Sequence, residues 1–237
     1  MGGGKNEMIV ISLGGSLIVP GEIDWKFLKE FRKEIVKQIE KGRKFIIVTG
    51  GGDIARKYQK AAGKIANLEQ DDMDWIGVHS TRLNAHLLKT IFRDYTHPRI
   101  NKNPRTKEDL MLHFNEGEKI MVAAGWRPGW STDYVATILA ERLGVKKMLN
   151  LSNIKYVYDK DPKKFKDAKK IKKINWVDFR LIVGDEWDPG LNAPFDPIAS
   201  KHAQEIGLEV IVAEGRNIEN LSKILEGGEF DGTVIKD

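Results

Sequence analysis

The sequence contains no cysteine. This absence excludes disulfides, thiolate metal sites and cysteine nucleophiles, so any bound metal must take oxygen or imidazole ligands. The sequence also lacks an apolar run of the roughly 18 residues that a membrane-spanning helix needs, and its first residues, MGGGKNE, lack the apolar stretch of a signal peptide. We therefore expect a cytoplasmic protein with no membrane partner.

Aromatic residues are scarce where the chain is most basic. The formal net charge is +5, and much of the lysine lies between Lys160 and Lys173, in KDPKKFKDAKKIKK. Aspartates interrupt this run, and it holds almost no side chain on which a base could stack. The pattern favours an exposed basic loop over a nucleic-acid surface. The positive charge is then available to an anionic small molecule.

The composition is that of an ordinary globular protein. Hydrophobic residues make up 41% of the 237 residues and charged residues 31%, which is enough apolar material for a substantial core. We expect residues 1–7 to form a flexible leader and residues 8–237 to form a single domain.

Short apolar runs alternate with segments of helical spacing along the whole chain. Strands alternating with helices predict an α/β protein, a three-layer αβα sandwich with a mostly parallel central sheet covered on both faces. Expected N-caps are Asp53, either Thr132 or Asp133, and Asp196. The expected strands cover 8–13, 44–49, 119–124, 146–151, 209–214 and 232–235, and the expected helices cover 25–40, 53–65, 74–92, 132–144, 175–183, 196–207 and 217–225.

Two of these strands run directly into glycine-rich turns. The first is followed by Gly14, Gly15 and Ser16, and the second by residues 50–52, all glycine. Glycine turns allow the backbone to approach an anion closely, and the N-termini of following helices add partial positive charge. Such turns also occur for purely steric reasons. Neither matches the P-loop or the dinucleotide-binding motif.

Six ordered stretches carry a resemblance to a known family, and they span nearly the whole chain from Met8 to Ile235. The chain resembles the amino acid kinase family and, within it, the archaeal-type UMP (uridylate) kinases. The stretches are LGGSLIVP from Leu13, VTGGGDIARKY from Val48, DWIGVHSTRLNAHLL from Asp74, AGWRPGWSTDYVA from Ala124, SNIKYVYDKDPKK from Ser152 and FDPIASKHA from Phe195.

The resemblance implies transfer of a phosphoryl group from ATP to a nucleoside monophosphate, most simply UMP to UDP. It divides residues 8–237 into an acceptor-side lobe, 8–145, and an ATP-side lobe, 146–237. It places ATP against Gly14, Gly15, Ser16, Ser152, Tyr158, Asp161 and Pro162. Because Tyr156 and Tyr158 alternate on a short strand, one of them could instead fill the core.

The resemblance also implies an acceptor site. Its residues are Gly51, Gly52, Arg56, Asp74, Arg82, Trp126 and Thr132. Arginine suits a phosphate because its planar fork gives paired hydrogen bonds to the oxygens. Two readings stay open, since Arg56 could be a surface charge and Asp74 could be a helix N-cap.

Asp133 and Asp196 match family aspartates close to the transferred phosphoryl group, although both could act only as helix caps. Phosphoryl transfer asks the protein chiefly for in-line placement and charge neutralisation. Mg²⁺ would then be held mainly by ATP oxygens and water, and we expect no dedicated protein metal site.

The chain departs from the family pattern at three places. Many relatives have a lysine where this chain has Ser12, so another cation must serve the γ-phosphate. Lys155 is the first choice, with Arg127 and Arg82 as further candidates. The second departure is Lys155-Tyr156 in place of the usual Asp-Gly. The third is Trp126 and Trp130, which could stack on a base or merely fill space.

Three other functions fit the same residues. A kinase of the same family could act on another small acceptor, or the fold could serve a nucleotide-binding storage or regulatory protein without transfer activity. The basic charge alone suggests a nucleic-acid module, which we disfavour. Family members commonly assemble as hexamers or dimers, so we expect a homo-oligomer.

Overall fold

A seven-stranded sheet forms the centre of the protein, with the strand order β3-β2-β1-β4-β8-β9-β7. The computed structural model describes residues 7–184, 186 and 193–237, so most of the expected leader lies outside the described residues. Neighbouring strands are parallel except β8 and β9. The strands are β1 (Met8–Leu13), β2 (Lys44–Thr49), β3 (Ile120–Ala123), β4 (Lys147–Ser152), β7 (Lys173–Ile174), β8 (Glu209–Glu214) and β9 (Thr233–Ile235).

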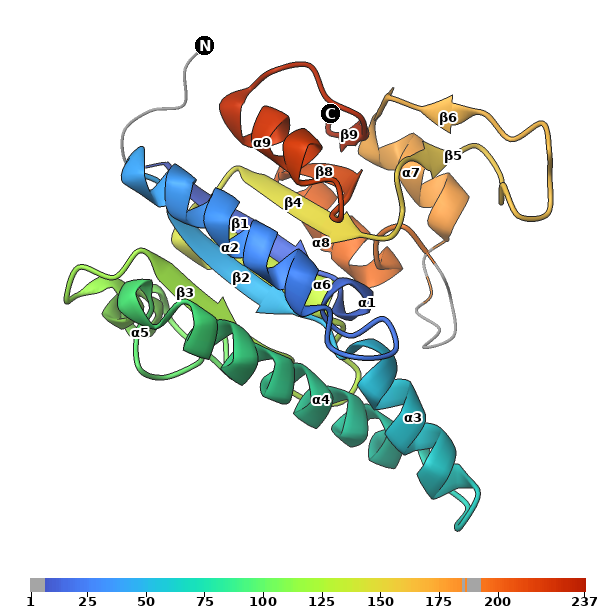
Figure 1. Cartoon of the computed structure of the whole chain (residues 1–237). Helices are drawn as coiled ribbons and strands as arrows, with labels where there is room; N and C mark the ends of the chain where they lie inside the picture. The colour runs from blue at the N-terminus through green and yellow to red at the C-terminus, as the bar shows by residue number, and fades with distance from the viewer. Residues whose placement is uncertain (1–6, 185, 187–192) are drawn as a thin grey trace.

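Helices cover both faces of this sheet (Figure 1). One buried cluster joins the sheet to α2 (Trp25–Glu40), α4 (Gln70–Ile91) and α9 (Ile218–Glu226). The other joins it to α6 (Thr132–Leu143), α7 (Trp176–Val183) and α8 (Pro197–Glu205). The three-layer α/β sandwich and its mostly parallel sheet are therefore confirmed.

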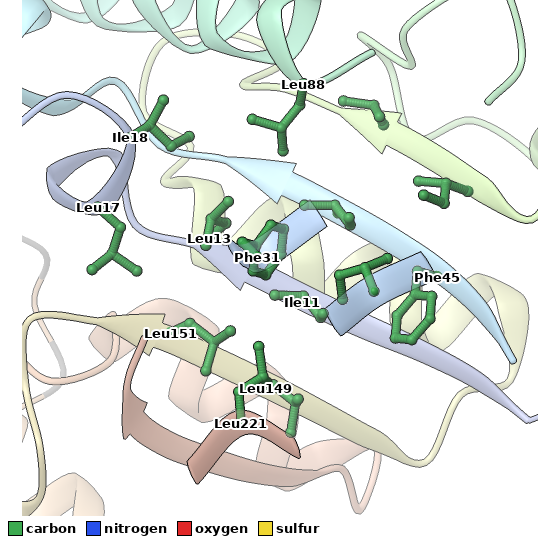
Figure 2. Packing of buried hydrophobic residues seen from close by; sticks show 14 of the residues in the cluster. Ile11, Leu13, Leu17, Ile18, Phe31, Phe45, Leu88, Leu149, Leu151 and Leu221 are labelled. Carbon is green, nitrogen blue, oxygen red and sulfur yellow. The ribbon is translucent and has the colours of Figure 1, made fainter. Parts of the chain in front are cut away.

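The apolar strands serve both clusters because successive side chains point to opposite faces. On β1, Ile11 and Leu13 belong to the first cluster and Val10 to the second. Figure 2 shows Ile11 and Leu13 beside Phe31 of α2 and Leu149 of β4. A strand buried on both faces must be apolar throughout, which explains why these strands read as continuous hydrophobic runs.

The structure gives different N-cap residues from those expected for two of the three helices. Helix α3 (Gly52–Gly63) is capped by Gly51, so Asp53 lies in its first turn. The cap of α6 is Ser131, which accepts from the Tyr134 N–H, so the expectation of Thr132 or Asp133 was wrong. Asp196 does cap α8, and its carboxylate accepts from the Ala199 N–H at 2.6 Å.

Several short elements were not expected from the sequence. They are α1 (Gly15–Ile18), α5 (Lys107–Met111), the 3₁₀ turns Arg93–Tyr95 and Leu112–Phe114, and β6 (Lys170–Ile171), which pairs antiparallel with β5 (Val157–Tyr158), the short strand expected around Tyr156 and Tyr158. Helix α4 begins earlier than expected because Glu69 and Asp72 form a capping box. The basic segment around residues 160–169 is largely exposed, as expected. Among the described helices, none has the length and apolar character needed to cross a membrane.

A buried histidine lies at the opposite end of the sheet from the glycine turns. His113 is 8% exposed, and its Nδ1 has no hydrogen-bond partner among the described residues. The ring of His97 meets it edge-on with 4.6 Å between ring centroids. Burial, and secondarily the nearby His97, lowers the pKa of His113 to about 4. His113 is therefore neutral at pH 7.

We predict that His113 makes the protein less stable in mild acid. Its pKa falls from 6.5 in the unfolded chain to about 4 in the folded one, so the unfolded state binds more protons between these values and stability drops as the pH falls. From pH 7.5 to pH 5 this costs about 2 kcal/mol. The difference in the free energy of unfolding between the wild type and a variant without this imidazole, measured by urea unfolding at both pH values, should show this cost.

His113→Gln should remove that part of the pH dependence. The comparison must be made against the wild type, because burial raises the pKa of Asp133 to about 6 and this carboxyl changes stability in the opposite direction. If the free energy of unfolding changes equally with pH in both proteins, His113 does not titrate as described.

Candidate functional site

The strand order itself marks the position of a site. The chain moves from β1 outward to β2 and β3 on one side, and then crosses to β4 on the other side of β1. Ligands of open α/β sheets bind beyond the carboxyl ends of the strands at such a reversal. Here the two strand ends are joined directly, because the Gly14 N–H donates to the Leu151 carbonyl at 2.8 Å.

Two glycine turns touch each other beside this point. A Cβ added to Gly15 would lie 2.0 Å from the Gly52 nitrogen, and one added to Gly50 would lie 2.4 Å from the Gly15 nitrogen. Gly52 also has a φ of +69°, which favours glycine. The Asn84 amide braces the second turn by donating to the carbonyls of Gly50 and Gly51. The structure thus brings Gly14–Ser16 and Gly51–Gly52 together, and two anions could bind side by side.

Two carboxyl groups, the partly buried Asp133 and the buried Asp196, lie together near Ser12 of β1, two residues before the first glycine turn. The Ser12 hydroxyl of β1 donates to Asp133 Oδ1 at 2.7 Å, and the Asp196 N–H donates to Asp133 Oδ2 at 3.4 Å. Asp133 stands in the first turn of α6 and Asp196 at the start of α8. The positive ends of two helices therefore converge where these carboxylates lie.

The surroundings of the two carboxyl groups raise the pKa of both. Burial raises the pKa of Asp133 to about 6, the Ser12 hydrogen bond lowers it, and the charge of Asp196 raises it again. Burial also raises the pKa of Asp196. The Asp196 Oδ2 atom is buried and has no hydrogen-bond partner among the described residues. A shifted, incompletely paired carboxyl pair at a sheet edge is typical of a functional site.

Asp74 and Arg82 hold the loop of residues 125–131 against α4. The Gly129 N–H donates to Asp74 Oδ2 at 2.8 Å, and Arg82 donates to the Trp126 carbonyl at 2.9 Å. The alternative that Asp74 is an N-cap was wrong, since α4 starts at Gln70. The expected roles of these residues in acceptor binding stay predictions.

The two tryptophans of this loop pack on one another. Their ring centroids are 4.6 Å apart in an edge-on arrangement, and the guanidinium of Arg127 lies over both, at 4.3 Å from Trp126 and 5.2 Å from Trp130. Tyr134 continues the cluster at 4.5 Å from Trp130. The space-filling alternative accounts for these contacts, while stacking on a base stays a prediction.

Arg56 follows the second glycine turn in the chain, whereas Thr132 belongs to a distant segment. Arg56, in the first turns of α3, is largely exposed and lies 3.5 Å from Asp53. Thr132 is the first residue of α6, directly before Asp133. An exposed guanidinium at this helix is free to turn toward a ligand, but it also fits the alternative of a surface charge.

The expected ATP-side residues lie after β4. The Ser152 hydroxyl accepts from the Ile154 N–H, Tyr158 lies in β5, and Asp161 with Pro162 forms a turn in which Asp161 accepts from the Lys163 N–H. Gly14 is packed against Ser152, so the first glycine turn and the start of this segment are in contact. The turn at Asp161 belongs to the exposed basic segment.

Lys155 and Tyr156 are anchored by a residue that sequence reasoning missed. Lys155 Nζ lies 3.0 Å from Asp231 Oδ2, and the Tyr156 hydroxyl donates to Asp231 Oδ1 at 2.6 Å. The Tyr156 side chain is buried, which answers the question of which tyrosine fills the core. Lys155 makes no contact with Ser12 or Asp133, and its expected catalytic role gains no support from this geometry.

Comparisons with known proteins identify the family of the chain and proteins with a similar overall fold. Residues 7–214 match the family described as the amino acid kinase family. The uridylate kinase of Thermoplasma acidophilum is 36% identical over 98% of each chain, and that of Methanocorpusculum labreanum is 34% identical over 96% of this chain and 94% of its own. The crystal structure of uridylate kinase from Archaeoglobus fulgidus superposes with a TM-score of 0.79 at 31% identity, covering 96% of this chain and 99% of the other.

We predict that Gly15→Ala destabilises the fold strongly. The new methyl group would meet backbone atoms of the second glycine turn, which cannot rotate away as a side chain could. Overpacking of this kind costs on the order of 3 kcal/mol. Gly21→Ala is the matched control, because a Cβ there meets nothing within 4 Å. Urea unfolding that shows equal small effects for both variants would contradict the contact between the turns.

Proposed function

Because the chain belongs to the amino acid kinase family, we propose that it transfers the γ-phosphoryl group of ATP to a nucleoside monophosphate, with UMP as the acceptor. The observation that carries the proposal is the direct contact of the two glycine turns beside the carboxyl pair Asp133 and Asp196. Two phosphate groups bound on touching turns are close enough for in-line transfer. The relatives named uridylate kinases favour UMP.

The proposed site divides into a donor half and an acceptor half, and the donor half takes residues from both proposed lobes, 8–145 and 146–237. In our proposal the donor residues are Gly14, Gly15, Ser16, Ser152, Tyr158, Asp161 and Pro162. The acceptor phosphate would bind to Gly51, Gly52 and Arg56, and the acceptor nucleoside to Asp74, Arg82, Trp126 and Thr132. The acceptor set is supported by the hydrogen bonds that fix the 125–131 loop beside α4.

Asp133 and Asp196 are the carboxylates that would face a phosphate-bound Mg²⁺. The described residues contain no cluster of three or more metal-binding side chains, and the lone acceptor atom Asp196 Oδ2 fits contact through water to an ion that phosphate oxygens already hold. When bound, Mg²⁺ would neutralise charge on the transferring group. Asp133 accepts from the Ser12 hydroxyl and from the Asp196 N–H, and it would thereby hold the starts of α6 and α8 in fixed positions relative to the first glycine turn.

The test of this proposal is ADP release with Mg-ATP over a panel of nucleoside monophosphates. We predict turnover that is fastest with UMP. Asp133→Asn should lower kcat about ten-fold or more with little change in KM, because Asn keeps the shape and loses the charge. The cap of α6 is Ser131, so this substitution leaves the helix start intact.

The outcomes separate the competing functions. ATP binding without ADP release for any acceptor would replace transfer with a storage or regulatory function. Turnover with another small acceptor and not with UMP would keep the reaction and change the substrate. An Asp133→Asn enzyme with unchanged kcat would remove Asp133 from the catalytic group.

We further propose that two copies associate through the α3 and α4 face. Tyr58, Trp75 and Leu83 are 65%, 39% and 58% exposed there, and they line a pocket of about 340 Å³. Apolar exposure of this kind marks interaction surfaces. A second copy suits it because α3 also carries Lys57 and Lys60 while the start of α4 is acidic, so a two-fold arrangement can pair opposite charges.

We predict that Leu83→Glu produces monomers, because a buried charge at the centre of the contact is costly. Leu181→Glu is the matched control, since Leu181 is 82% exposed on α7, away from this face. Sedimentation velocity should show a dimer or a larger assembly for the wild type and for the control. A monomeric wild type, or a Leu83→Glu variant that still assembles, would exclude this face.

A further inference from the structure

The site needs a cation that the sequence does not supply at position 12. Ser12 is neutral and is committed to Asp133. The three cations considered from the sequence also have other contacts: Lys155 pairs with Asp231, Arg82 binds the Trp126 carbonyl, and Arg127 lies over two indole rings. Phosphate groups bound at the first glycine turn therefore require positive charge from another residue.

Arg216 lies against that turn. Its Nη2 is 3.5 Å from the Ser16 carbonyl oxygen, its Nη1 donates to Asp24 Oδ2, and its guanidinium lies 6.0 Å from the centre of the Phe27 ring. Among the described residues, no other arginine or lysine makes a hydrogen bond to Gly14, Gly15 or Ser16. The residue follows β8 at the carboxyl end of the sheet, two strands from β1.

The backbone that carries Arg216 is fixed beside the turn. The Gly215 N–H donates to the Ser152 carbonyl at 2.8 Å. A Cβ added to Gly215 would lie 2.3 Å from Leu17 Cδ1 and 3.1 Å from Leu151 Cβ, so this glycine packs against the short helix α1 and the end of β4. Figure 2 labels Leu17, which belongs to α1, and Leu151, which belongs to β4. Only the Arg216 side chain, with 39% of its surface exposed, is left to adjust.

Asp24 pairs with the guanidinium and is itself fixed. Its Oδ1 accepts from the Phe27 N–H as the N-cap of α2, which leaves Oδ2 for Arg216. The contact of Nη2 with Ser16 is at the long limit for a hydrogen bond and is weak. Nη2 can therefore exchange the carbonyl for a stronger, charge-assisted bond to a phosphate oxygen while Nη1 stays on Asp24.

We propose that Arg216 binds the β- and γ-phosphates of the donor nucleotide at the first glycine turn. This inference rests on the proposed function for the identity of the ligand. It gives the site the cation that position 12 lacks and assigns a binding role to a residue outside the six stretches that carry the family resemblance.

Binding measurements in the absence of acceptor test the proposal. A fluorescent ATP analogue is bound to the full chain and displaced by ATP, ADP and AMP. Arg216→Gln should weaken ATP and ADP about ten-fold or more and change AMP by less than about three-fold, because AMP lacks the contacted phosphates. Arg216→Lys should recover part of the affinity, since it keeps the charge and loses the planar fork.

Two further variants separate a phosphate contact from a purely structural one. Asp24→Asn breaks the same ion pair but keeps the guanidinium and a good N-cap, so ATP should bind within about three-fold of the wild type. Lys223→Gln removes one positive charge from α9, where Lys223 pairs with Glu219, and should bind ATP as the wild type does. Thermal unfolding of each variant checks that it is folded.

The inference is overturned if Arg216→Gln binds ATP like the wild type, if it weakens AMP as much as ATP, or if Asp24→Asn loses as much ATP affinity as Arg216→Gln. The last result would mean that the ion pair only fastens α2 to the end of β8. These readouts do not depend on turnover. A wild type that binds ATP but transfers no phosphoryl group would reject the proposed function and leave the test of Arg216 valid.

Discussion

The site depends on one close approach, the contact between the backbone at Gly15 and the backbone at Gly50 and Gly52. Parallel neighbouring strands β1 and β2 end side by side. The backbones of the turns that follow them can pack this closely only because the contacting residues have no side chain. The contact fixes the start of α3, where the Asp53 N–H donates to the Val19 carbonyl. It also leaves a surface of main-chain groups in which two phosphates could bind without an intervening side chain.

The sequence was sufficient for the layers and the principal strands, because strands buried on both faces must be apolar throughout and helices between them show one apolar face. It was insufficient at helix starts. Ser131, Thr132 and Asp133 are consecutive and all can cap a helix, so local propensity could not choose between them. The choice is made by Ser12, which is 121 residues away from Asp133 and binds its carboxylate. Two-residue strands such as β6 and β7 leave no periodic pattern to detect.

The candidate site was predictable where a motif marks it and unpredictable where packing alone assembles it. The glycine turns and the aspartates Asp133 and Asp196 lie in stretches that resemble the family. Arg216 is 200 residues from Ser16, and nothing in the local sequence EGRN signals the contact. Lys155 illustrates the converse case. Its position in a nucleotide-binding stretch suggested a catalytic cation, and the structure adds a contact that the sequence does not signal, with Asp231 from a distant loop.

The position of β9 has a consequence for how the chain acquires its structure during synthesis. β9 is the last strand of the chain, yet it lies between β8 and β7, and β7 pairs in the sheet only with β9. Just before it, Asp231 accepts from Tyr156 and donates its N–H to Asn220. In a chain leaving the ribosome, the half of the sheet beyond β8 and the anchor of the 155–156 segment would remain incomplete until residues 231–235 have emerged. Strands β1, β2 and β3 pair with one another without any part of this segment and could pair long before it appears.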